Sequence, residues 1–326
     1  MYIKKILITG AGGFIGSHLT ELCVEKGYKV KAFVHYNSQN YWEWLEGLPI
    51  LDEIEVVCGD VRDFDSVSRA MKGCDTVFHL AALIGIPYSY ESPLAYIRTN
   101  VEGAYNVLEA ARQYGCENVL ITSTSETYGT AQYVPIDEKH PMVGQSPYSA
   151  TKISADQLAI SYHRSFKLPV KIVRPFNTYG PRQSARAIIP TVITQLLSGK
   201  EELKLGNLHP TRDLTFVKDT ATAFIEIAKA DKLLGEITNV GMHQELSIGD
   251  LVKTIASLLG RNVTIIEDSQ RVRPKNSEVE RLFCDNAKIL KNTSWRPQYD
   301  LEKGLKETID WLAGKLNLYK TEVYNV

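Results

Sequence analysis

The segment Ile6–Leu19 reads ILITGAGGFIGSHL, and it decides the fold of the chain. Its apolar start predicts a buried strand, and the helical pattern that follows ends near Gly27. Glycines at such a junction allow a tight turn and a close approach of backbone amides to a pyrophosphate. A glycine cluster alone also fits an ordinary turn, but a place between strand and helix is the context that dinucleotide binding requires. The cofactor-binding residues predicted here are Gly10, Gly13, Phe14, Ile15 and Gly16.

Further apolar runs follow and alternate with longer helical patterns. In the segment Pro93–Tyr114, for example, apolar residues such as Val101, Leu108 and Ala111 recur at helical spacing. This alternation predicts an α/β fold in which helices cover both faces of a parallel sheet. Right-handed crossovers then make it a doubly wound, Rossmann-type sheet. The predicted strands are Ile6–Thr9, Val30–Val34, Ile54–Val57, Thr76–Leu80, Val119–Thr122 and Val170–Val173.

The character of the sequence changes after about Phe176, where turns and polar segments become frequent. Asn177–Pro181 is the first strong turn signal, and Ser247–Asp250 has the capping-box pattern that begins a short helix. We expect residues 1–176 to form the Rossmann domain and residues 177–326 to form mainly a smaller C-terminal substrate-binding lobe. Some segments of this lobe are expected to return to the sheet. Ligands of such sheets sit at the carboxyl ends of the strands, which places the substrate between the lobes.

Composition and charge exclude several classes of function. The chain has 326 residues, 44% of them hydrophobic, and a formal net charge of -1. It can bury a core, and it has no long-range field to attract nucleic acid or a membrane surface. Its five cysteines show neither a disulfide framework nor a metal-ligand spacing, so no metal is expected. Gly12 and Gly13 interrupt the first apolar run before a signal peptide could form, which predicts a cytoplasmic protein.

The second predicted strand ends in the sequence HYNS, residues 35–38. It lacks the Asp or Glu that would bind the adenosine ribose of NAD. The missing carboxylate removes a repulsion against the 2′-phosphate of NADP, but no arginine replaces it. His35 and Ser38 therefore favour NADP over NAD only slightly, and His35 also fits a solvated strand end.

Two segments carry residues suited to proton transfer. Thr122–Gly129 places hydroxyl and carboxyl side chains at the end of a strand, and Tyr148 and Lys152 begin a helix four residues apart. An ammonium neighbour and a cationic nicotinamide both favour the phenolate, which brings a group that titrates near ~10 toward use as a base. A YxxxK pair alone also fits two surface residues. Together with the glycine turn and the strand end, the Tyr148–Lys152 pair becomes a specific indication of proton-transfer chemistry.

With these motifs the chain resembles an extended short-chain dehydrogenase/reductase of the nucleotide-sugar epimerase/dehydratase group. The resemblance covers nearly the whole chain and includes Gly59–Val61, His79–Ala82 and Arg174–Asn177. It implies that Asp60 and Val61 flank the adenine of the cofactor. It also implies that Ala81 lies on the phosphate side and that Lys152 contacts the nicotinamide ribose. Further cofactor-binding positions implied by the resemblance are Leu80, Ala82, Asn100, Thr122 and Tyr148.

The resemblance implies that Tyr148 removes the proton of the sugar 4-hydroxyl while a hydride passes from C4 to the cofactor. Simple epimerases usually carry a small residue where this chain has Glu126. Once C4 is a ketone, Glu126 has a further use, because it can remove the C5 proton and expel the 6-hydroxyl as water. The expected reaction is therefore a 4,6-dehydration. Its expected catalytic residues are Thr124, Ser125, Glu126, Tyr148 and Lys152.

Among these enzymes the sequence is most similar to the 4,6-dehydratases of nucleotide-linked N-acetylglucosamine of the legionaminic-acid type. The similarity rests on Ser123–Glu126, Ser146–Lys152, Pro210–Leu214 and Arg273–Leu282, and it implies UDP- or GDP-N-acetylglucosamine as the substrate. Hexose 4,6-dehydratases carry Asp-Glu after the threonine, whereas Ser125 stands at the first of these positions here. Either a hydroxyl group or water replaces that acid, or the glutamate carries out both proton transfers.

Three other functions stay open. The Ser-Glu pair also resembles that of UDP-glucuronic acid decarboxylases. Such an enzyme needs a cation for the substrate carboxylate, and Arg98, Arg182 and Arg186 are candidates that also fit surface charges. A 4-epimerase would only reduce the ketone from the other face. A regulator that binds NAD(P) on the same fold is the non-enzyme alternative, although such proteins usually lose the tyrosine or the lysine.

The smaller lobe is expected to hold the nucleotide diphosphate. Arginine forks meet phosphate oxygens bidentately, and Arg212 and Arg273 are the candidates. The resemblance adds Asn177 on the phosphate or sugar side and Ile189 beside the nucleobase. Arg273 also fits a solvated residue of a charged stretch.

The family resemblance also implies a homodimer. The helices expected at residues 93–114 and 148–166 would pair across a two-fold axis. Their apolar faces support this arrangement. The expected partners are thus a nucleotide sugar and a second copy of the chain, without nucleic acid or membrane.

Overall fold

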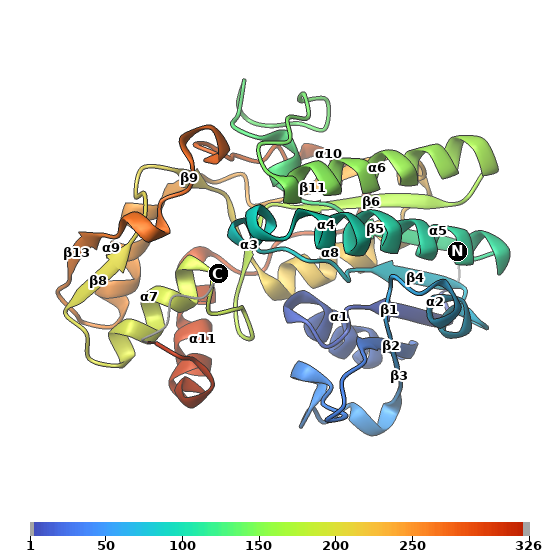
Figure 1. The fold of residues 1–326 in the computed structure, drawn as a ribbon, viewed down its shortest axis with the longest axis horizontal. Helices are drawn as coiled ribbons and strands as arrows, with labels where there is room; N and C mark the ends of the chain where they lie inside the picture. Colours follow the sequence, from blue (N-terminus) through green and yellow to red (C-terminus); the bar gives the residue numbers. More distant parts are fainter. Residues whose placement is uncertain (1–2, 322–326) are drawn as a thin grey trace.

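The structure, a computed structural model that describes residues 3–321, is built on a seven-stranded parallel sheet (Figure 1). The strand order is β11-β6-β5-β4-β1-β2-β3. From β1 the chain adds β2 and β3 on one side of the sheet and then β4, β5, β6 and β11 on the other side. This order confirms the doubly wound, Rossmann-type sheet. The strands are β1 (Lys5–Thr9), β2 (Lys29–His35), β3 (Ile54–Gly59), β4 (Thr76–His79), β5 (Asn118–Thr122), β6 (Val170–Pro175) and β11 (Ile237–Val240).

Helices cover both faces of the sheet because successive residues of its strands point to opposite sides. Ile6 and Ile8 of β1 face one core, which they share with α1 (Phe14–Glu25) and α8 (Val217–Lys229). Leu7 between them faces the other core, which it shares with α2, α5 and α6. Each fully buried side chain of this kind contributes about 1.5–3 kcal/mol. The bounds of the second set of helices are Phe64–Met71 for α2, Gly103–Gln113 for α5 and Pro147–Phe166 for α6.

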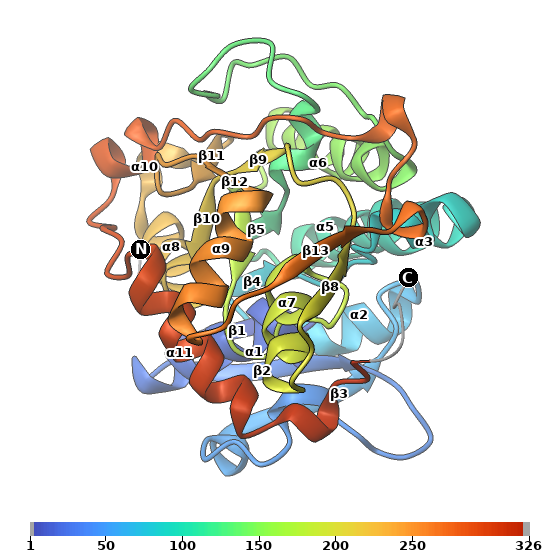
Figure 2. The ribbon, with the colours of Figure 1, turned by 90° about the vertical axis from the view of Figure 1, so that its left-hand side faces the viewer.

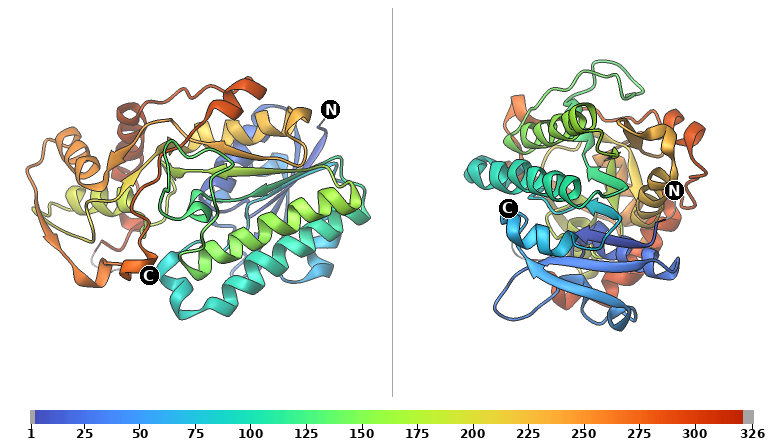
Figure 3. Two further views of the ribbon diagram at one scale, coloured as in Figure 1. Left: turned by 90° about the horizontal axis from the view of Figure 1, so that it is seen from above. Right: turned by 90° about the vertical axis from the view of Figure 1, so that its right-hand side faces the viewer.

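The helix expected over residues 93–114 is present but irregular. It begins as α4 (Pro93–Tyr96), continues with π-helical hydrogen bonding as η3 (Ile97–Glu102) and ends as α5. The helix α3 (Ile86–Glu91) precedes it. The helices α5 and α6 lie side by side on one face of the sheet (Figure 3). Wide turns of this kind are frequent near functional sites.

The residues after 176 form a second layer of structure beyond the carboxyl ends of the strands (Figure 2). Three small two-stranded sheets and a separate apolar core hold it together. However, α8 and β11 from the same half of the chain pack into the large sheet, so the chain passes between the two parts more than once. The strands are β7 (Asn177–Tyr179), β8 (Glu202–Leu205), β9 (Thr211–Arg212), β10 (Leu214–Phe216), β12 (Leu246–Ser247) and β13 (Thr264–Glu267). The α-helices are α7 (Ile188–Leu197), α9 (Ile248–Leu258), α10 (Ala287–Asn292) and α11 (Leu301–Ala313).

Short 3-10 helices occur in the connections. They are η1 (Glu43–Leu45), η2 (Leu51–Glu53), η4 (Ser125–Tyr128), η5 (Asp231–Leu233), η6 (Ser269–Arg271), η7 (Lys275–Ser277) and η8 (Leu316–Leu318). Ser247 caps α9 through its hydroxyl oxygen, which accepts from the Asp250 amide at 3.0 Å. The Asp250 carboxylate accepts from the Ser247 hydroxyl and not from its amide, so only half of the expected capping box forms. Within residues 3–321, no helix has the length and apolarity needed to cross a membrane.

Candidate active site

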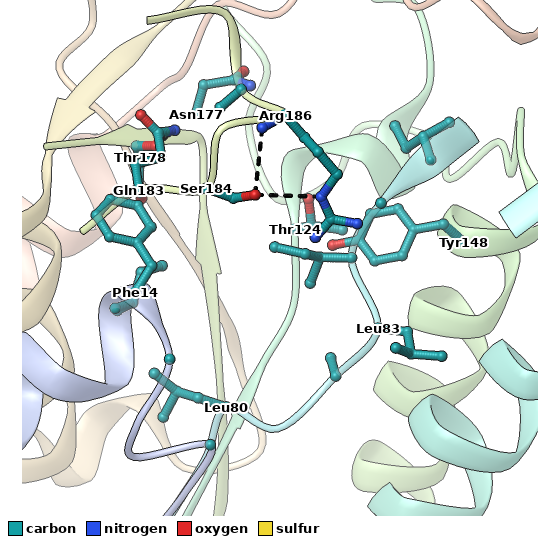
Figure 4. A pocket seen from close by; sticks show the side chains of 18 of the residues that line it. Phe14, Leu80, Leu83, Thr124, Tyr148, Asn177, Thr178, Gln183, Ser184 and Arg186 are labelled. Atoms are coloured by element: carbon teal, nitrogen blue, oxygen red, sulfur yellow. Dashed lines mark hydrogen bonds between the residues drawn. The ribbon is translucent and has the colours of Figure 1, made fainter. Parts of the chain in front are cut away.

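A cleft of about 1280 Å³ opens where the carboxyl ends of the parallel strands meet the C-terminal lobe. Figure 4 shows part of its lining, including Tyr148 and Thr124 opposite Asn177 and Phe14. Two predicted site residues, Ser38 and Asn100, do not line this cleft. The predicted residues that line it are Gly10, Gly13, Phe14, Ile15, Gly16, His35, Asp60, Val61, Leu80, Ala81, Ala82, Thr122, Thr124, Ser125, Glu126, Tyr148, Lys152, Asn177, Ile189, Arg212 and Arg273.

The glycine turn forms a cradle that side chains would fill. Gly10 has φ +69°, and a Cβ built on it would lie 2.8 Å from the Ala81 amide nitrogen. A Cβ on Gly16 would overlap the carbonyl oxygen of Gly10. Gly13 precedes α1 without a side-chain cap, so the first amides of the helix are left for a ligand. These features fit the pyrophosphate of a dinucleotide.

The end of the cradle beside β2 and β3 carries a charged side chain that the sequence analysis did not predict. Asp60 follows β3 and accepts from the Arg62 guanidinium, with Nε 2.9 Å from Oδ2. This hydrogen bond lowers the pKa of Asp60. His35 lies nearby, with Nε2 3.7 Å from the same Asp60 oxygen. Sequence reasoning missed Arg62, although its place two residues after Asp60, at the edge where β2 and β3 end, could have indicated it.

Glu43 also lines this end of the cleft, and sequence reasoning missed it as well. The residue has φ +56°, a conformation that brings its carboxylate over the glycine turn. A Cβ on Gly12 would lie 2.9 Å from its Oε2 atom. Burial raises the pKa of Glu43, and the charge of His35 opposes this effect. Ser38 lies in the same connection but is exposed to solvent and outside the cleft.

Asn100 lies behind the cleft wall and is buried. Its side-chain oxygen accepts from the Leu83 amide at 2.8 Å, and its side-chain nitrogen donates to Thr151 Oγ1 at 3.0 Å. The same nitrogen donates to the Leu83 carbonyl at 3.0 Å. Asn100 thus fixes the loop after β4 against the start of α6 and has no lining atom in the cleft.

Tyr148 and Lys152 lie on the first turns of α6, which a reciprocal Ser146–Ser149 capping box begins. Lys152 Nζ donates to the Thr122 carbonyl at 2.5 Å. Burial lowers the pKa of Lys152 to about 8, and Asp156 opposes this effect.

Burial also raises the pKa of Tyr148, and a hydrogen bond with Thr124 partly opposes the rise. The negative charge of Glu126 raises this pKa further. We expected the neighbouring ammonium to favour the phenolate, but in the protein alone burial is the larger influence on Tyr148.

A buried ion pair fixes the strand that carries these groups. Arg174 on β6 lies 2.6 Å from Asp156 on α6, and both side chains are fully buried. The same carboxylate accepts from the Ser123 hydroxyl at 2.6 Å. The guanidinium also stacks over the Tyr128 ring, 4.5 Å from its centroid. Loss of one partner of such a buried pair costs about 3–5 kcal/mol, so this pair positions the end of β5 firmly.

Glu126 lies in η4, directly after the strand end, and lines the cleft while 91% of its surface is buried. Its charge raises the pKa of Tyr148 and opposes the lowering of the Arg212 pKa. Burial lowers the pKa of Arg212. Ser125 is also buried and lines the same wall. A carboxylate therefore faces the reacting side of the cleft next to the phenol.

Two arginines of the C-terminal lobe share one carboxylate. Glu278 Oε1 lies 3.5 Å from Arg212 Nη2 and 3.6 Å from Arg273 Nη1. Arg273 Nη1 is buried and makes no hydrogen bond, and neither does the buried Oδ1 atom of Asn177. The guanidinium nitrogen fits an acceptor such as a diphosphate oxygen, and the amide oxygen fits a donor such as a sugar hydroxyl. Sequence reasoning missed Glu278, since nothing local separates it from its charged neighbours.

The three arginines considered for a substrate carboxylate lie in different places. Arg98 is exposed on η3 and does not line the cleft. Arg182 lines the cleft, but it donates to Glu21 Oε2 at 2.6 Å and so links the lobe to α1. Arg186 reaches across to the side of Thr124 and Tyr148 (Figure 4).

A Rossmann sheet with a glycine cradle, a Tyr-Lys pair and a capping lobe is the arrangement of the extended short-chain dehydrogenase/reductase class. A family model described as "GDP-mannose 4,6 dehydratase" matches residues 7–308. The chain therefore belongs to this family of nucleotide-sugar dehydratases and epimerases. The similar proteins named by the comparisons carry out different reactions.

A putative UDP-glucose 4-epimerase of Methanocaldococcus jannaschii is 31% identical over 94% of this chain and 98% of its own length. A UDP-N-acetyl-alpha-D-glucosaminuronate decarboxylase of Bacillus cytotoxicus is 33% identical over 94% of this chain and 97% of its own length. The solved dTDP-glucose 4,6-dehydratase of Streptomyces venezuelae, with NAD bound, has a TM-score of 0.85 and 27% identity. That match covers 97% of this chain and 99% of the other. The comparisons thus fix the family and leave the reaction among three.

Proposed function

We propose that this protein is a 4,6-dehydratase of a nucleotide-linked N-acetylglucosamine, with UDP or GDP as the nucleotide. The observation that carries the proposal is the carboxylate of Glu126 on the Tyr148 side of the cleft. Epimerisation and decarboxylation both need the oxidation at C4, which Tyr148 and Lys152 serve. A carboxylate at this wall is an additional group, and removal of the C5 proton is a use for it.

In this proposal Tyr148 takes the proton of the 4-hydroxyl group. NAD, held by the glycine cradle, supplies when bound the chemistry that takes a hydride from C4 and returns it at C6. Glu126 takes the C5 proton, which the C4 ketone has made acidic. The C6–O bond breaks with protonation of the leaving hydroxyl, so that water is released. Once the hydride has returned at C6, C5 takes up a proton that comes from solvent, and a 4-keto-6-deoxy sugar remains.

Glu126 also supplies the proton for the leaving hydroxyl in this proposal. Ser125 stands where hexose dehydratases have an aspartic acid, and a serine hydroxyl is a far weaker acid than a carboxylic acid. The proton that Glu126 takes from C5 is available for the 6-hydroxyl, because both positions are adjacent on the sugar. One carboxylate then carries out both transfers.

Decarboxylation of a nucleotide-linked hexuronate is the second candidate. It is favoured by the cleft-lining guanidinium of Arg186, which could hold a C6 carboxylate. It is also favoured by the 33% identity with the Bacillus cytotoxicus decarboxylase.

We propose NAD as the cofactor. Asp60 and Glu43 bring two carboxylates to the adenosine end of the cradle, and the charge of Arg62 is taken up by Asp60. Carboxylates accept from ribose hydroxyls and repel a 2′-phosphate. This arrangement outweighs the slight preference for NADP that the end of β2 alone suggested.

We further propose the homodimer through α5 and α6. Large apolar side chains are exposed on these two helices and on the turns that lead into α5: Tyr105 (45%) on α5, Phe166 (53%) on α6, Leu94 (56%) on α4 and Ile97 (49%) on η3. An apolar surface of this kind on adjacent helices is typical of a two-fold interface. Light scattering that shows a monomer would contradict it.

The reaction is tested by incubation with UDP-, GDP- and dTDP-sugars, with and without N-acetyl groups, in heavy water, followed by NMR. Dehydration gives deuterium at C5 and a new C6 methyl group. Decarboxylation gives a five-carbon product and carbon dioxide. Inversion at C4 without label identifies an epimerase, and either of the last two outcomes would overturn the proposed dehydration.

A further inference from the structure

Arg186 extends from the loop between β7 and α7 to the loop after β4. A Cβ built on Gly85 would lie 2.5 Å from Arg186 Nη1 and 3.5 Å from the Tyr96 hydroxyl. The guanidinium thus occupies the space that the missing side chain of Gly85 leaves open. Tyr96 donates to the Gly85 carbonyl, which fixes this loop, and its ring packs against Tyr148 with centroids 6.2 Å apart. Arg186 is therefore seated beside the proposed catalytic base (Figure 4).

Among residues 3–321, no carboxylate forms an ion pair with Arg186. Its Nε donates to Ser184 Oγ at 3.3 Å, and its terminal nitrogens donate no hydrogen bond to any residue between 3 and 321. In the same part of the chain, no carboxylate oxygen lies within 4.0 Å of its guanidinium. Each other arginine that lines the cleft has an ion pair: Arg62 with Asp60, Arg182 with Glu21, Arg212 and Arg273 with Glu278, and Arg271 with Asp268.

An unpaired guanidinium at the reacting end of a cleft needs an acceptor when the substrate displaces its water. The plane of its terminal nitrogens matches an sp² oxygen group, such as a carboxylate or an amide carbonyl. A sugar hydroxyl is a poorer match because it presents a single sp³ oxygen. The position beside Tyr148, the proposed base for the sugar hydroxyl, places this acceptor on the sugar and not on the nucleotide.

We propose that Arg186 is a specificity-determining residue that binds a planar acyl oxygen on the substrate sugar. This inference rests on the proposed function, since it assigns the sugar to the same site. Two sources supply that chemistry, namely the N-acetyl carbonyl at C2 and a carboxylate at C6. Sugars without either group leave the guanidinium without its acceptor and bind less well.

The inference is tested by calorimetric titration of a Tyr148→Phe background with three sugars of one nucleotide: glucose, N-acetylglucosamine and glucuronic acid. The nucleotide is UDP, GDP or dTDP, whichever diphosphate binds most tightly alone. Because binding is measured without turnover, a failed dehydration assay would sink the proposed reaction and leave this test intact. We expect the wild-type arginine to favour one acyl sugar over the glucose form by about 10- to 100-fold.

Arg186→Ala should remove this preference while the affinity for the glucose form changes by less than about threefold. Loss in the N-acetylglucosamine arm assigns the amide, and loss in the glucuronic acid arm assigns the carboxylate. Gly85→Ala should give the same loss, because its methyl group displaces the guanidinium although the arginine remains. Arg98→Ala, which removes an exposed arginine outside the cleft, is the matched control and should change nothing. Equal losses in all three arms, or no loss with Arg186→Ala, would overturn the inference.

Discussion

The two halves of the cleft are built in different ways. The cofactor half consists mainly of the turns that follow β1 to β4, and backbone contacts set its shape, such as the Gly10 amide donating to the Phe33 carbonyl at 3.0 Å. The substrate half consists of side chains from distant segments, and its charged members include Glu126, Arg186, Arg212, Arg273 and Glu278. A backbone cradle serves one ligand type, whereas exchangeable side chains can serve several. This difference explains why relatives about 30% identical share the fold and carry out three reactions.

The largest expected effect falls on the chemical step that both halves share. Tyr148→Phe removes the group that takes the 4-hydroxyl proton, so kcat should fall by about 10⁴-fold. NAD should still bind, because the cradle is unchanged. Steady-state kinetics and calorimetry check both points, with Tyr133→Phe, outside the cleft, as control. Unchanged turnover would rule out the phenol as the base.

Glu126→Gln tests the substrate half alone. Loss of the carboxylate should lower the rate of elimination by about 10³-fold. Oxidation at C4 should continue, and a 4-keto sugar that keeps its 6-hydroxyl should accumulate. Mass spectrometry of single-turnover mixtures distinguishes the two products. Glu280→Gln, an exposed carboxylate nearby, should behave as wild type, and normal dehydration by the Glu126 variant would remove the central argument.

Gly16→Ala tests whether the backbone sets the cofactor half. The added methyl group would overlap the Gly10 carbonyl oxygen, and backbone cannot move aside cheaply. Strain of about 3 kcal/mol should weaken NAD binding by about 100-fold. Gly249→Ala in α9 is the control, because its Cβ would meet no heavy atom closer than 3.6 Å. Calorimetric titration that gives wild-type affinity for Gly16→Ala would break the comparison.

Glu43→Gln sharpens the comparison between the two halves, because Glu43 contributes a side chain to the cofactor half, whose shape is otherwise set by backbone. Removal of its charge should reduce the preference for NAD over NADP by about tenfold. Titration of both cofactors gives the ratio directly. Glu46→Gln, in the same connection but outside the cleft, should leave the ratio unchanged. A wild-type preference for NADP would refute the role proposed for Glu43.

The smallest expected effect is a pH dependence set by Lys152. Burial lowers its pKa to about 8, so the ammonium form is lost as the pH rises through that value. Activity that needs the ammonium should fall by about half between pH 7 and pH 8. Lys152→Arg stays charged and should lose this decline, although at lower activity. A wild-type kcat that stays constant up to pH 9 would contradict this role of the Lys152 ammonium group.

The fold was largely predictable because parallel strands buried on both faces are continuous apolar runs. Six of the seven strands in the large sheet follow from such runs, whereas β11 lies far along the chain and was not assigned to it. Most predicted residues next to strand ends line one cleft because parallel strands end at the same edge of the sheet, although Ser38 lies outside it. Asn100 does not line it either, because its side chain satisfies the loop after β4. The raised pKa of Tyr148 could not be predicted from the sequence either, because it is caused by burial, and burial depends on tertiary packing.

The sequence by itself determined the sheet, the glycine turn and the hydroxyl, carboxyl and amine groups available at the strand ends. These properties are local, because they depend on the side-chain periodicity of a strand and on the conformational freedom of glycine. Only the tertiary structure decided that Arg186 enters the space beside Gly85, that Glu278 holds two arginines and that Glu43 covers the glycine turn. Charges separated by many residues influence one another through space, and their distances exist only once the chain has folded.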